Sequence, residues 1–492
     1  MSKVALCLAG ALVVFLQGVA FADANSKWLG PDKQALLDTP ERLPFFPHRA
    51  NTSDNAVLSS GMFDDAEVCG TCHQEIYAQW RTSAMARSWD DPIYRALLKK
   101  ASEATDGAVD NFCTGCHTPV GLTTGKITSA VNRASVEETA ESHPMPGVDC
   151  EACHNINART GIDNGAYVLA PRSRGGRPTK YGPRSDAESP YHETVYSELH
   201  TRSDFCGTCH NVTHPFNGVA IERTYDEWLE SEYAVKGIDC QSCHMAGFKG
   251  KAAIMGPERD DVASHWFAGA NATLLSHFGD DEAAQMGSRM LQSAAQIEIV
   301  EQPQSLAPGE LANFTVEVHN TGAGHKLPTG FPEGREVWID FEVSDATGKS
   351  VYRLGQVRNG RTEPGTRNFR VHLGDKDGNE VEYAVWDVTH IISDNRILPN
   401  GKASAVFAFI VPEGAVGPLK AKATLRYWPF PQGLVDELVG EGKVDVKITD
   451  MTRTQVTVPM AVERTADRVD ASGTPQAASH VGKVCNAEGS CS

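Results

Sequence analysis

The sequence predicts a multidomain chain in which a mainly helical and loop domain, residues 23–291, is followed by an antiparallel β-sandwich of the immunoglobulin type, residues 292–465. Two observations predict this fold class. Five Cys-x-x-Cys-His motifs lie between residues 69 and 244, ahead of the predicted sandwich. After residue 292 the pattern changes to short strands rich in Val, Ile, Phe and Thr, separated by Pro-Gly, Thr-Gly and Asn-Gly turns.

The first residues predict export. Lys3 precedes an apolar stretch that ends in the small-x-small site Ala20-Phe21-Ala22, which is typical of a secretory signal peptide over residues 1–22. A retained membrane anchor is the alternative, but the apolar run is short, and no later stretch approaches the ~20 apolar residues that span a bilayer. We therefore expect a periplasmic or extracellular protein with no integral membrane span after cleavage of the signal.

Composition excludes one class of partner. The formal net charge is -18, and Lys and Arg are dispersed along the chain rather than gathered in a basic stripe. Since nucleic-acid binding depends on concentrated positive charge, nucleic acid is not an expected partner. The acidity itself is that of a solvated surface, with steering of basic partners as the alternative.

The cysteines of the N-terminal domain follow one spacing. Thirteen cysteines in an exported chain would ordinarily indicate disulfides, but ten of them fall into the five motifs. The motif residues are Cys69, Cys72 and His73; Cys113, Cys116 and His117; Cys150, Cys153 and His154; Cys206, Cys209 and His210; and Cys240, Cys243 and His244.

This spacing has a chemical reason. Two thiols three positions apart on a helical turn can form thioethers with the vinyl groups of one haem, and the following histidine can then bind the iron. A zinc site would need paired Cys-x-x-Cys units without the recurring histidine, and a thioredoxin-like redox pair would occur once. The sequence therefore predicts five covalently attached haems c, close together because the motifs recur about every 35 residues.

Five six-coordinate irons need five further ligands. His143 precedes the third motif, His192 and His200 precede the fourth, and His265 follows the last motif beside Trp266. These histidines are candidate sixth ligands, with surface or core histidines as the alternative. His48, His214 and His277 are less favourably placed.

The combination "CGTCHQEIYAQWRTSAMARSW", "FCTGCHTP", "GVDCEACH", "SDFCGTCHNV" and "CQSCHM", followed by a β-domain with "NTGAGHKLPTG", resembles the multihaem c-type cytochromes with a c-554-like haem region. The resemblance covers residues from about 60 to 465. It implies a helical and loop haem region, mostly two histidine ligands per iron, and electron transfer. It also implies that His325, between Gly324 and Pro328 on a loop of the β-domain, is a sixth ligand for a haem of the other domain.

One residue departs from the family pattern. Relatives often carry a histidine in the helix after the first motif, within Trp-x-x-Ser-x-His, where this chain has Met85. A thioether ligand would raise the reduction potential of that haem relative to two imidazoles, and ordinary helix packing is the equal alternative.

Residues 466–492 are small and polar and are expected to form a flexible tail, in which Cys485 and Cys491 would close a disulfide loop or cross-link two chains. The function expected from the sequence is electron transfer between redox partner proteins, without a catalytic residue. One alternative is a reductase of nitrogen or sulfur oxyanions with one open haem site. Another is a subunit of an extracellular filament, an oligomer that shares haem ligands between chains.

Overall fold

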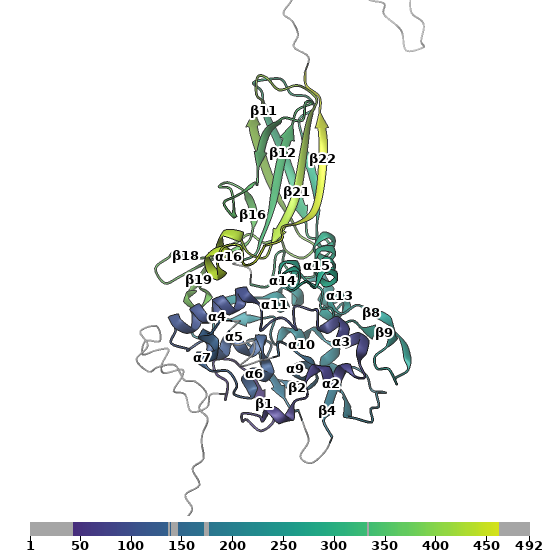
Figure 1. The fold of residues 1–492 in the computed structure, drawn as a ribbon. Helices are drawn as coiled ribbons and strands as arrows, with labels where there is room; N and C mark the ends of the chain where they lie inside the picture. The colour runs from purple at the N-terminus through teal and green to yellow at the C-terminus, as the bar shows by residue number, and fades with distance from the viewer. Residues whose placement is uncertain (1–42, 136–137, 139–145, 172–176, 332–333, 462–492) are drawn as a thin grey trace, which may run out of the picture.

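The computed structural model describes residues 43–135, 138, 146–171, 177–331 and 334–461. The predicted signal peptide, His143 and the predicted tail with its two cysteines lie outside the described residues. Figure 1 shows the described chain in two parts, a lower region of short helices and an upper, elongated pair of sheets.

The lower part, residues 43–294, consists of short helices joined by loops and small strand pairs. The small sheets are β1–β3–β2, β4–β5, β6–β7 and β8–β9. The helices are α2 (Ala66–Gly70), α3 (Gln74–Trp80), α4 (Pro92–Ala104), α5 (Asp110–His117), α6 (Pro119–Thr123), α7 (Ser129–Arg133), α9 (Cys150–His154), α10 (Ser203–Gly207), α11 (Thr224–Leu229), α12 (Glu232–Val235), α13 (Cys240–His244), α14 (Ala272–His277) and α15 (Asp281–Ala294). The strands are β1 (Asn51–Thr52), β2 (Ile156–Arg159), β3 (Tyr167–Leu169), β4 (Thr179–Gly182), β5 (Glu193–Tyr196), β6 (Val212–Thr213), β7 (Ala220–Glu222), β8 (Gly247–Lys251) and β9 (Glu258–Ala263).

Local sequence explains where the best-defined of these helices begins. Asp91 caps α4, because its side chain accepts hydrogen bonds from the amides of Ile93 (2.9 Å) and Tyr94 (3.3 Å). Pro92 occupies the first turn, where its missing N–H costs nothing. The Asp91-Pro92 pair therefore starts a new helix after the turns of residues 81–90.

The upper part is built from two antiparallel sheets, β10–β11–β20 and β13–β12–β21–β22, with β16 also paired to β12. Phe341 of β12 stacks on Phe407 of β20 with ring centres 4.4 Å apart, so the two sheets pack face to face through a shared apolar core. The strands are β10 (Gln296–Glu301), β11 (Leu311–His319), β12 (Glu336–Ser344), β13 (Ser350–Leu354), β16 (Arg367–Phe369), β20 (Lys402–Ile410), β21 (Leu419–Trp428) and β22 (Thr449–Val458).

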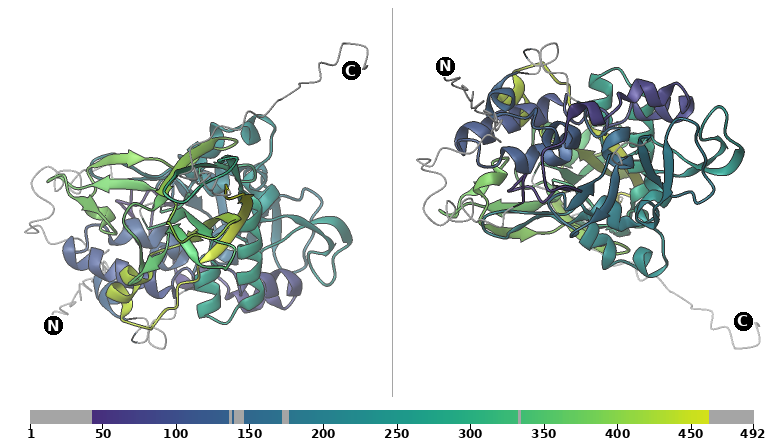
Figure 2. Two further views of the ribbon diagram at one scale, coloured as in Figure 1. Left: turned by 90° about the horizontal axis from the view of Figure 1, so that it is seen from above. Right: turned by 90° about the horizontal axis from the view of Figure 1, so that it is seen from below.

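Smaller elements join the two parts. Helix α16 (Gln432–Val439) packs against α4, where Ile93 meets Trp338, Trp428 and Val435 in one apolar cluster. A second contact comes from the sheet of β17 (Val371–Gly374), β18 (Glu380–Val381) and β19 (His390–Asp394), which lies between the two parts in Figure 1. The views from above and below in Figure 2 show the sheets stacked directly over the helices. The β-part is thus docked on the haem-motif region rather than tethered by a linker.

The two parts differ in how they are held together. The sheets enclose one large cluster of buried apolar side chains, whereas the lower part contains several small clusters around Phe45, Trp89 and Leu275. Among the described helices, none is long and apolar enough to cross a membrane.

Candidate haem sites

Each Cys-x-x-Cys-His motif lies on one turn of helix. The second, third and fifth motifs are contained in α5, α9 and α13. In the first and fourth motifs the helix ends at the glycine after the first cysteine, but the backbone of His73 still donates to Cys69 (2.9 Å) and that of His210 to Cys206 (2.8 Å). The helical turn therefore continues through every motif and presents both thiols and the histidine together.

The five motif histidines share a second feature. Four of them place Nδ1 against a backbone carbonyl: His73 on Ala252 (2.7 Å), His117 on Ser88 (3.0 Å), His154 on Tyr181 (2.7 Å) and His244 on Ala268 (2.6 Å). A carbonyl accepts only, so Nδ1 carries the proton and Nε2 keeps its lone pair. The fifth, His210, has Nδ1 3.5 Å from a carboxylate oxygen of Glu222. In all five the nitrogen that binds haem iron is available, and the ring orientation is set.

Burial acts to lower the pKa of these imidazoles, whereas Glu222 acts to raise the pKa of His210. Burial lowers the pKa of His117 to about 4 and that of His154 to about 3. Neutral imidazole is the form that binds a metal ion, so this environment suits ligation. Burial also acts to lower the pKa of His210, but the Glu222 carboxylate outweighs it and raises this pKa to about 9, so that binding of a metal ion at Nε2 would displace a proton there.

Cysteines of different motifs lie close together. Cys69 of the first motif lies near Cys150 of the third, and Cys206 of the fourth lies near Cys240 of the fifth. Cys116 of the second motif meets Cys209 of the fourth in the same way. The contacts therefore group the first motif with the third, and the fourth motif with both the second and the fifth.

Two of the predicted sixth ligands face motif histidines at a suitable separation. Two imidazoles that bind one metal ion from opposite sides, each with a metal–nitrogen bond of about 2 Å, have ring centres roughly 6 Å apart. The rings of His73 and His192 are 6.4 Å apart, and those of His154 and His265 are 6.5 Å apart. Nδ1 of His192 and Nδ1 of His265 each lie on a backbone carbonyl, which leaves Nε2 for a ligand bond.

His200 and His48 are arranged differently. His200 also faces His154, at 5.7 Å, but its Nε2 lies 3.1 Å from the carbonyl of Cys153, so that Nδ1 is the nitrogen left over. His48 is completely buried, accepts the amide of Ala50 at Nδ1 (3.1 Å) and has Nε2 3.5 Å from the thiol of Cys116. In that tautomer neither nitrogen of His48 has a free lone pair for iron.

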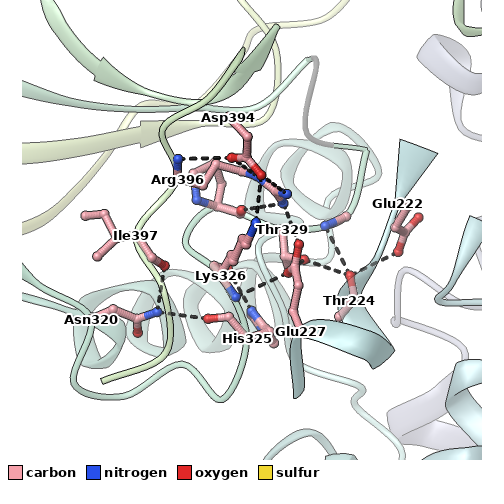
Figure 3. Close-up of polar contacts among 12 residues, drawn as sticks. Glu222, Thr224, Glu227, Asn320, His325, Lys326, Thr329, Asp394, Arg396 and Ile397 are labelled. Carbon is pink, nitrogen blue, oxygen red and sulfur yellow. Dashed lines mark hydrogen bonds and ion pairs between the residues drawn. The ribbon is translucent and has the colours of Figure 1, made fainter. Parts of the chain in front are cut away.

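The predicted ligand from the β-part, His325, lies in the interface between the two parts of the molecule (Figure 3). Its Nδ1 donates to the carbonyl of Lys326 (2.9 Å), so Nε2 is free. Burial lowers the pKa of His325, and the nearby His244 of the fifth motif lowers it further. His325 and the fifth motif are therefore brought together from chain segments some 80 residues apart.

A network of charged groups holds the His325 loop. Glu227 of α11 forms a buried ion pair with Arg396 (2.8 Å) and accepts from the hydroxyl of Thr329 (2.7 Å) and the amide of Lys326 (3.2 Å). Asp394 at the end of β19 pairs with Lys326 (2.7 Å) and Arg396 (2.8 Å). In these contacts, drawn in Figure 3, Glu227 links the loop to the haem-motif region, and Asp394 braces the loop within the β-part.

Gly324 and Asn320 shape the same loop. A Cβ atom on Gly324 would lie 3.3 Å from the ring of Tyr233, which is closer than side chains normally pack. The side-chain amide of Asn320 donates to the carbonyls of His325 (2.8 Å) and Ile397 (3.2 Å). A side chain at position 324 would therefore require the Tyr233 ring of α12 to shift by a few tenths of an ångström, and the role of Gly324 in bringing the loop to a haem stays a prediction.

A cavity of about 350 Å³ adjoins the fifth motif. Cys243 and His244 line it together with Trp266, Met286 and Met290, and Arg289 supplies a positive charge. An apolar wall with one cation suits a porphyrin and its propionates. Together with free motif thiols and oriented imidazoles, this lining fits haem c.

Three further residues bear on the sequence predictions, one of them a predicted ligand and two that the sequence did not indicate. Met85 is half-buried in the turns after α3, and its carbonyl accepts from the amide of Val148 (2.9 Å); its role as a ligand stays a prediction. Sequence reasoning overlooked Tyr94, whose ring stacks on His117 at 3.6 Å, and Glu222 beside His210. Neither residue belongs to a motif, so no signal along the chain marked them.

The chain is similar to known proteins in the sequence of one segment and in its fold. Residues 68–155 match the family model described as cytochrome c554 and c-prime. The fold is similar to that of a penta-heme cytochrome c552 from Thermochromatium tepidum, with 20% sequence identity, a TM-score of 0.54 and coverage of 82% of this chain and 99% of the other. The CARDB domain of a Pyrococcus furiosus protein in complex with di-metal ions matches with a TM-score of only 0.16, at 14% identity over 34% of this chain and 87% of that chain. No curated protein matches the sequence.

The motif turns, the oriented imidazoles and these two likenesses together support the class of a multihaem c-type cytochrome with a c554-like region. Its cofactor is haem c, and a multihaem cytochrome of this class indicates electron transfer.

Proposed function

We propose that this chain is an exported pentahaem c-type cytochrome that transfers electrons between redox partner proteins in the periplasm or outside the cell. The observation that carries the proposal is the common state of the five motif histidines. Each has Nδ1 engaged by an acceptor and Nε2 free, which is what an iron ligand requires.

The residues of the five motifs bind the haems and hold them in a fixed arrangement. The cysteines of each motif hold one haem by two thioethers, and the histidine beside them binds its iron. Haem c, when bound, takes up and releases single electrons at iron. The motif cysteines of neighbouring sites lie close together, so haems bound there would be near enough for electron transfer between them.

The sixth ligands follow from the imidazole pairs. We assign His192 to the first motif, His265 or His200 to the third, and His325 to the fifth. His143 and Met85 remain proposed ligands for sites that the described contacts leave open. In this assignment residues 23–291 form the haem domain, and residues 292–465 form an immunoglobulin-like domain that donates one ligand and docks through the Glu227–Arg396 ion pair.

The proposal is tested by electron paramagnetic resonance and visible spectroscopy of the purified holoprotein, with haem counted by its pyridine complex. Five haems per chain, all low-spin when ferric, are the expected result. A count below five would contradict the assignment of all five motifs. A high-spin ferric iron would indicate an open site, and nitrogen and sulfur oxyanions would then be tested as substrates.

A further inference from the structure

One of the five motif histidines has a different partner from the other four. His73, His117, His154 and His244 each donate Nδ1–H to a neutral backbone carbonyl. His210 alone among the motif histidines faces a carboxylate, with Nδ1 3.5 Å from Oε1 of Glu222. Both geometries leave Nε2 free, but they place different charge behind the imidazole.

The fold delivers Glu222 to this position. Strand β6 starts two residues after His210 and pairs with β7 so that Val212 lies opposite Glu222, which returns the carboxylate to the histidine. Glu222 is 4% exposed and accepts a hydrogen bond from the hydroxyl of Thr224 (3.2 Å). In the described part of the chain, His210 is the one group within ion-pair distance of Glu222, so no Lys or Arg neutralises it.

A buried carboxylate behind an imidazole increases the electron density on the ligating nitrogen. Outer partners of this kind raise the basicity of a metal-bound histidine, and hydrogen bonding around a haem is one of the means by which a protein sets its potential. A more basic ligand stabilises ferric over ferrous iron. We propose that Glu222 is a positioning residue that lowers the reduction potential of the haem held by the fourth motif, below the value that a carbonyl partner would give.

The fourth motif lies between two other motifs, so the reduction potential of its haem affects electron transfer between them. The fourth motif contacts the second through Cys116 and Cys209 and the fifth through Cys206 and Cys240. Electrons that pass between those neighbours meet the fourth site on the way. Glu222 thus makes the fourth site, at a junction between two others, harder to reduce than a carbonyl partner would make it.

Glu222 is also linked to the β-part. Its partner Thr224 contacts the hydroxyl of Thr329 (2.8 Å), which donates to Glu227 (2.7 Å) beside the His325 loop. Figure 3 shows this path from Glu222 to the loop. The loop therefore helps to hold the carboxylate, and a substitution that disturbs Thr224 is unsuitable as a control.

The experiment compares Glu222→Gln, Glu222→Asp and Asp226→Asn as holoproteins, in redox titrations followed by electron paramagnetic resonance. Glu222→Gln removes the charge and keeps the shape, whereas Glu222→Asp keeps the charge. Asp226→Asn removes a charge of the same sign from α11, where Asp226 pairs with Arg223 and accepts from Asn211 (3.2 Å) rather than facing the motif histidine. Haem counting by the pyridine complex shows whether each variant carries its cofactors.

With Glu222→Gln we expect one signal to change its field position and its ferric-to-ferrous ratio at fixed potential about tenfold, equivalent to about 59 mV for one electron. Glu222→Asp should restore most of this shift, and Asp226→Asn should produce much less. Unchanged potentials in a five-haem Glu222→Gln protein, or an equal shift with Asp226→Asn, would overturn the inference. The inference rests on the proposed haem at His210, and a count below five in the unsubstituted protein would instead refute that proposal.

Discussion

His325 illustrates how much of this molecule depends on single side chains. Its ring nitrogen Nδ1 donates to Lys326, its backbone carbonyl accepts from Asn320, and its loop is fastened through Glu227. These contacts leave Nε2 as the free nitrogen near the fifth motif. The loop therefore costs little further ordering when Nε2 binds a metal ion.

Replacing His325 with alanine should convert one ferric iron from low spin to high spin, because the site loses its proposed sixth ligand. Electron paramagnetic resonance of the purified holoprotein measures the change. His319→Ala is the matched control, since His319 lies in the same segment and contacts Glu317 (3.4 Å) instead of a motif. A spectrum with His325→Ala identical to that of the unsubstituted protein would remove His325 from the ligand set.

Asp394 makes the docking of the loop sensitive to acid. Burial raises its pKa, but Arg396 and Lys326 outweigh this and hold the pKa at about 2. Because the folded pKa is below the unfolded value of about 3.9, the stabilisation is fully present above pH ~4 and is lost as the pH falls towards 2.

Asp394→Asn should therefore shift the acid transition of the low-spin spectrum to higher pH, because the loop loses an ion pair at neutral pH. Acid titration followed in the visible spectrum gives the midpoint. Asp377→Asn, an exposed acid paired only with the adjacent Lys376, serves as the control and should leave the midpoint in place. Equal midpoints for Asp394→Asn and the control would exclude this acid-sensitive contact.

At the level of elements, helix α4 connects the two parts of the molecule. Its first turn carries Ile93 into the cluster with Trp338, Trp428 and Val435, while Tyr94 on the neighbouring face stacks on His117. One helix thus packs against the β-part and orients a motif histidine. The position of α4 follows from its Asp91 cap and Pro92 start, which local sequence specifies.

Ile93→Ala should destabilise the docked β-part by about 2–5 kcal/mol, since it leaves a cavity among large buried side chains. Differential scanning calorimetry should show a lowered or separated transition. Leu398→Ala is a control of similar size on an exposed side chain and should change the transition by less than about 0.5 kcal/mol. A transition as stable as that of the control would mean that α4 does not support the docking.

Across the whole molecule, the two parts differ in how many buried apolar side chains stabilise them. The sheets enclose a continuous core that includes Phe314, Phe341 and Phe407. The lower part has only small apolar clusters around its motifs. Bound haem would have to complete the interior of the lower part, which matches the closeness of the motifs along the chain.

A chain produced without haem attachment should accordingly keep the sheets folded and lose the ordered lower part. Limited proteolysis with mass spectrometry should then yield a resistant fragment that begins close to Gln296, where β10 starts. The holoprotein digested in parallel should resist over both parts. Equal resistance of the lower part with and without haem would show that its side chains alone suffice.

Short-range sequence patterns predicted part of the fold and the haem attachment sites. The motif spacing predicted haem attachment, and the match to the cytochrome c554 and c-prime model supports the multihaem class. Alternating strands after residue 292 predicted antiparallel sheets, which the structure contains. Both features depend on residues within one turn or one strand of each other, so a single sequence carries them.

The cofactor chemistry and the succession of helical motifs and strands could be predicted from the sequence, because thioether spacing and strand alternation are local properties. The folded structure was needed to show which imidazoles face each other, that Nδ1 of His325 is occupied, and that Glu222 lies behind His210. Those relations join residues through the β6–β7 turn, the α4 contact and the loop held by Glu227 and Arg396. Such contacts depend on how elements pack, and the packing is a property of the whole folded chain.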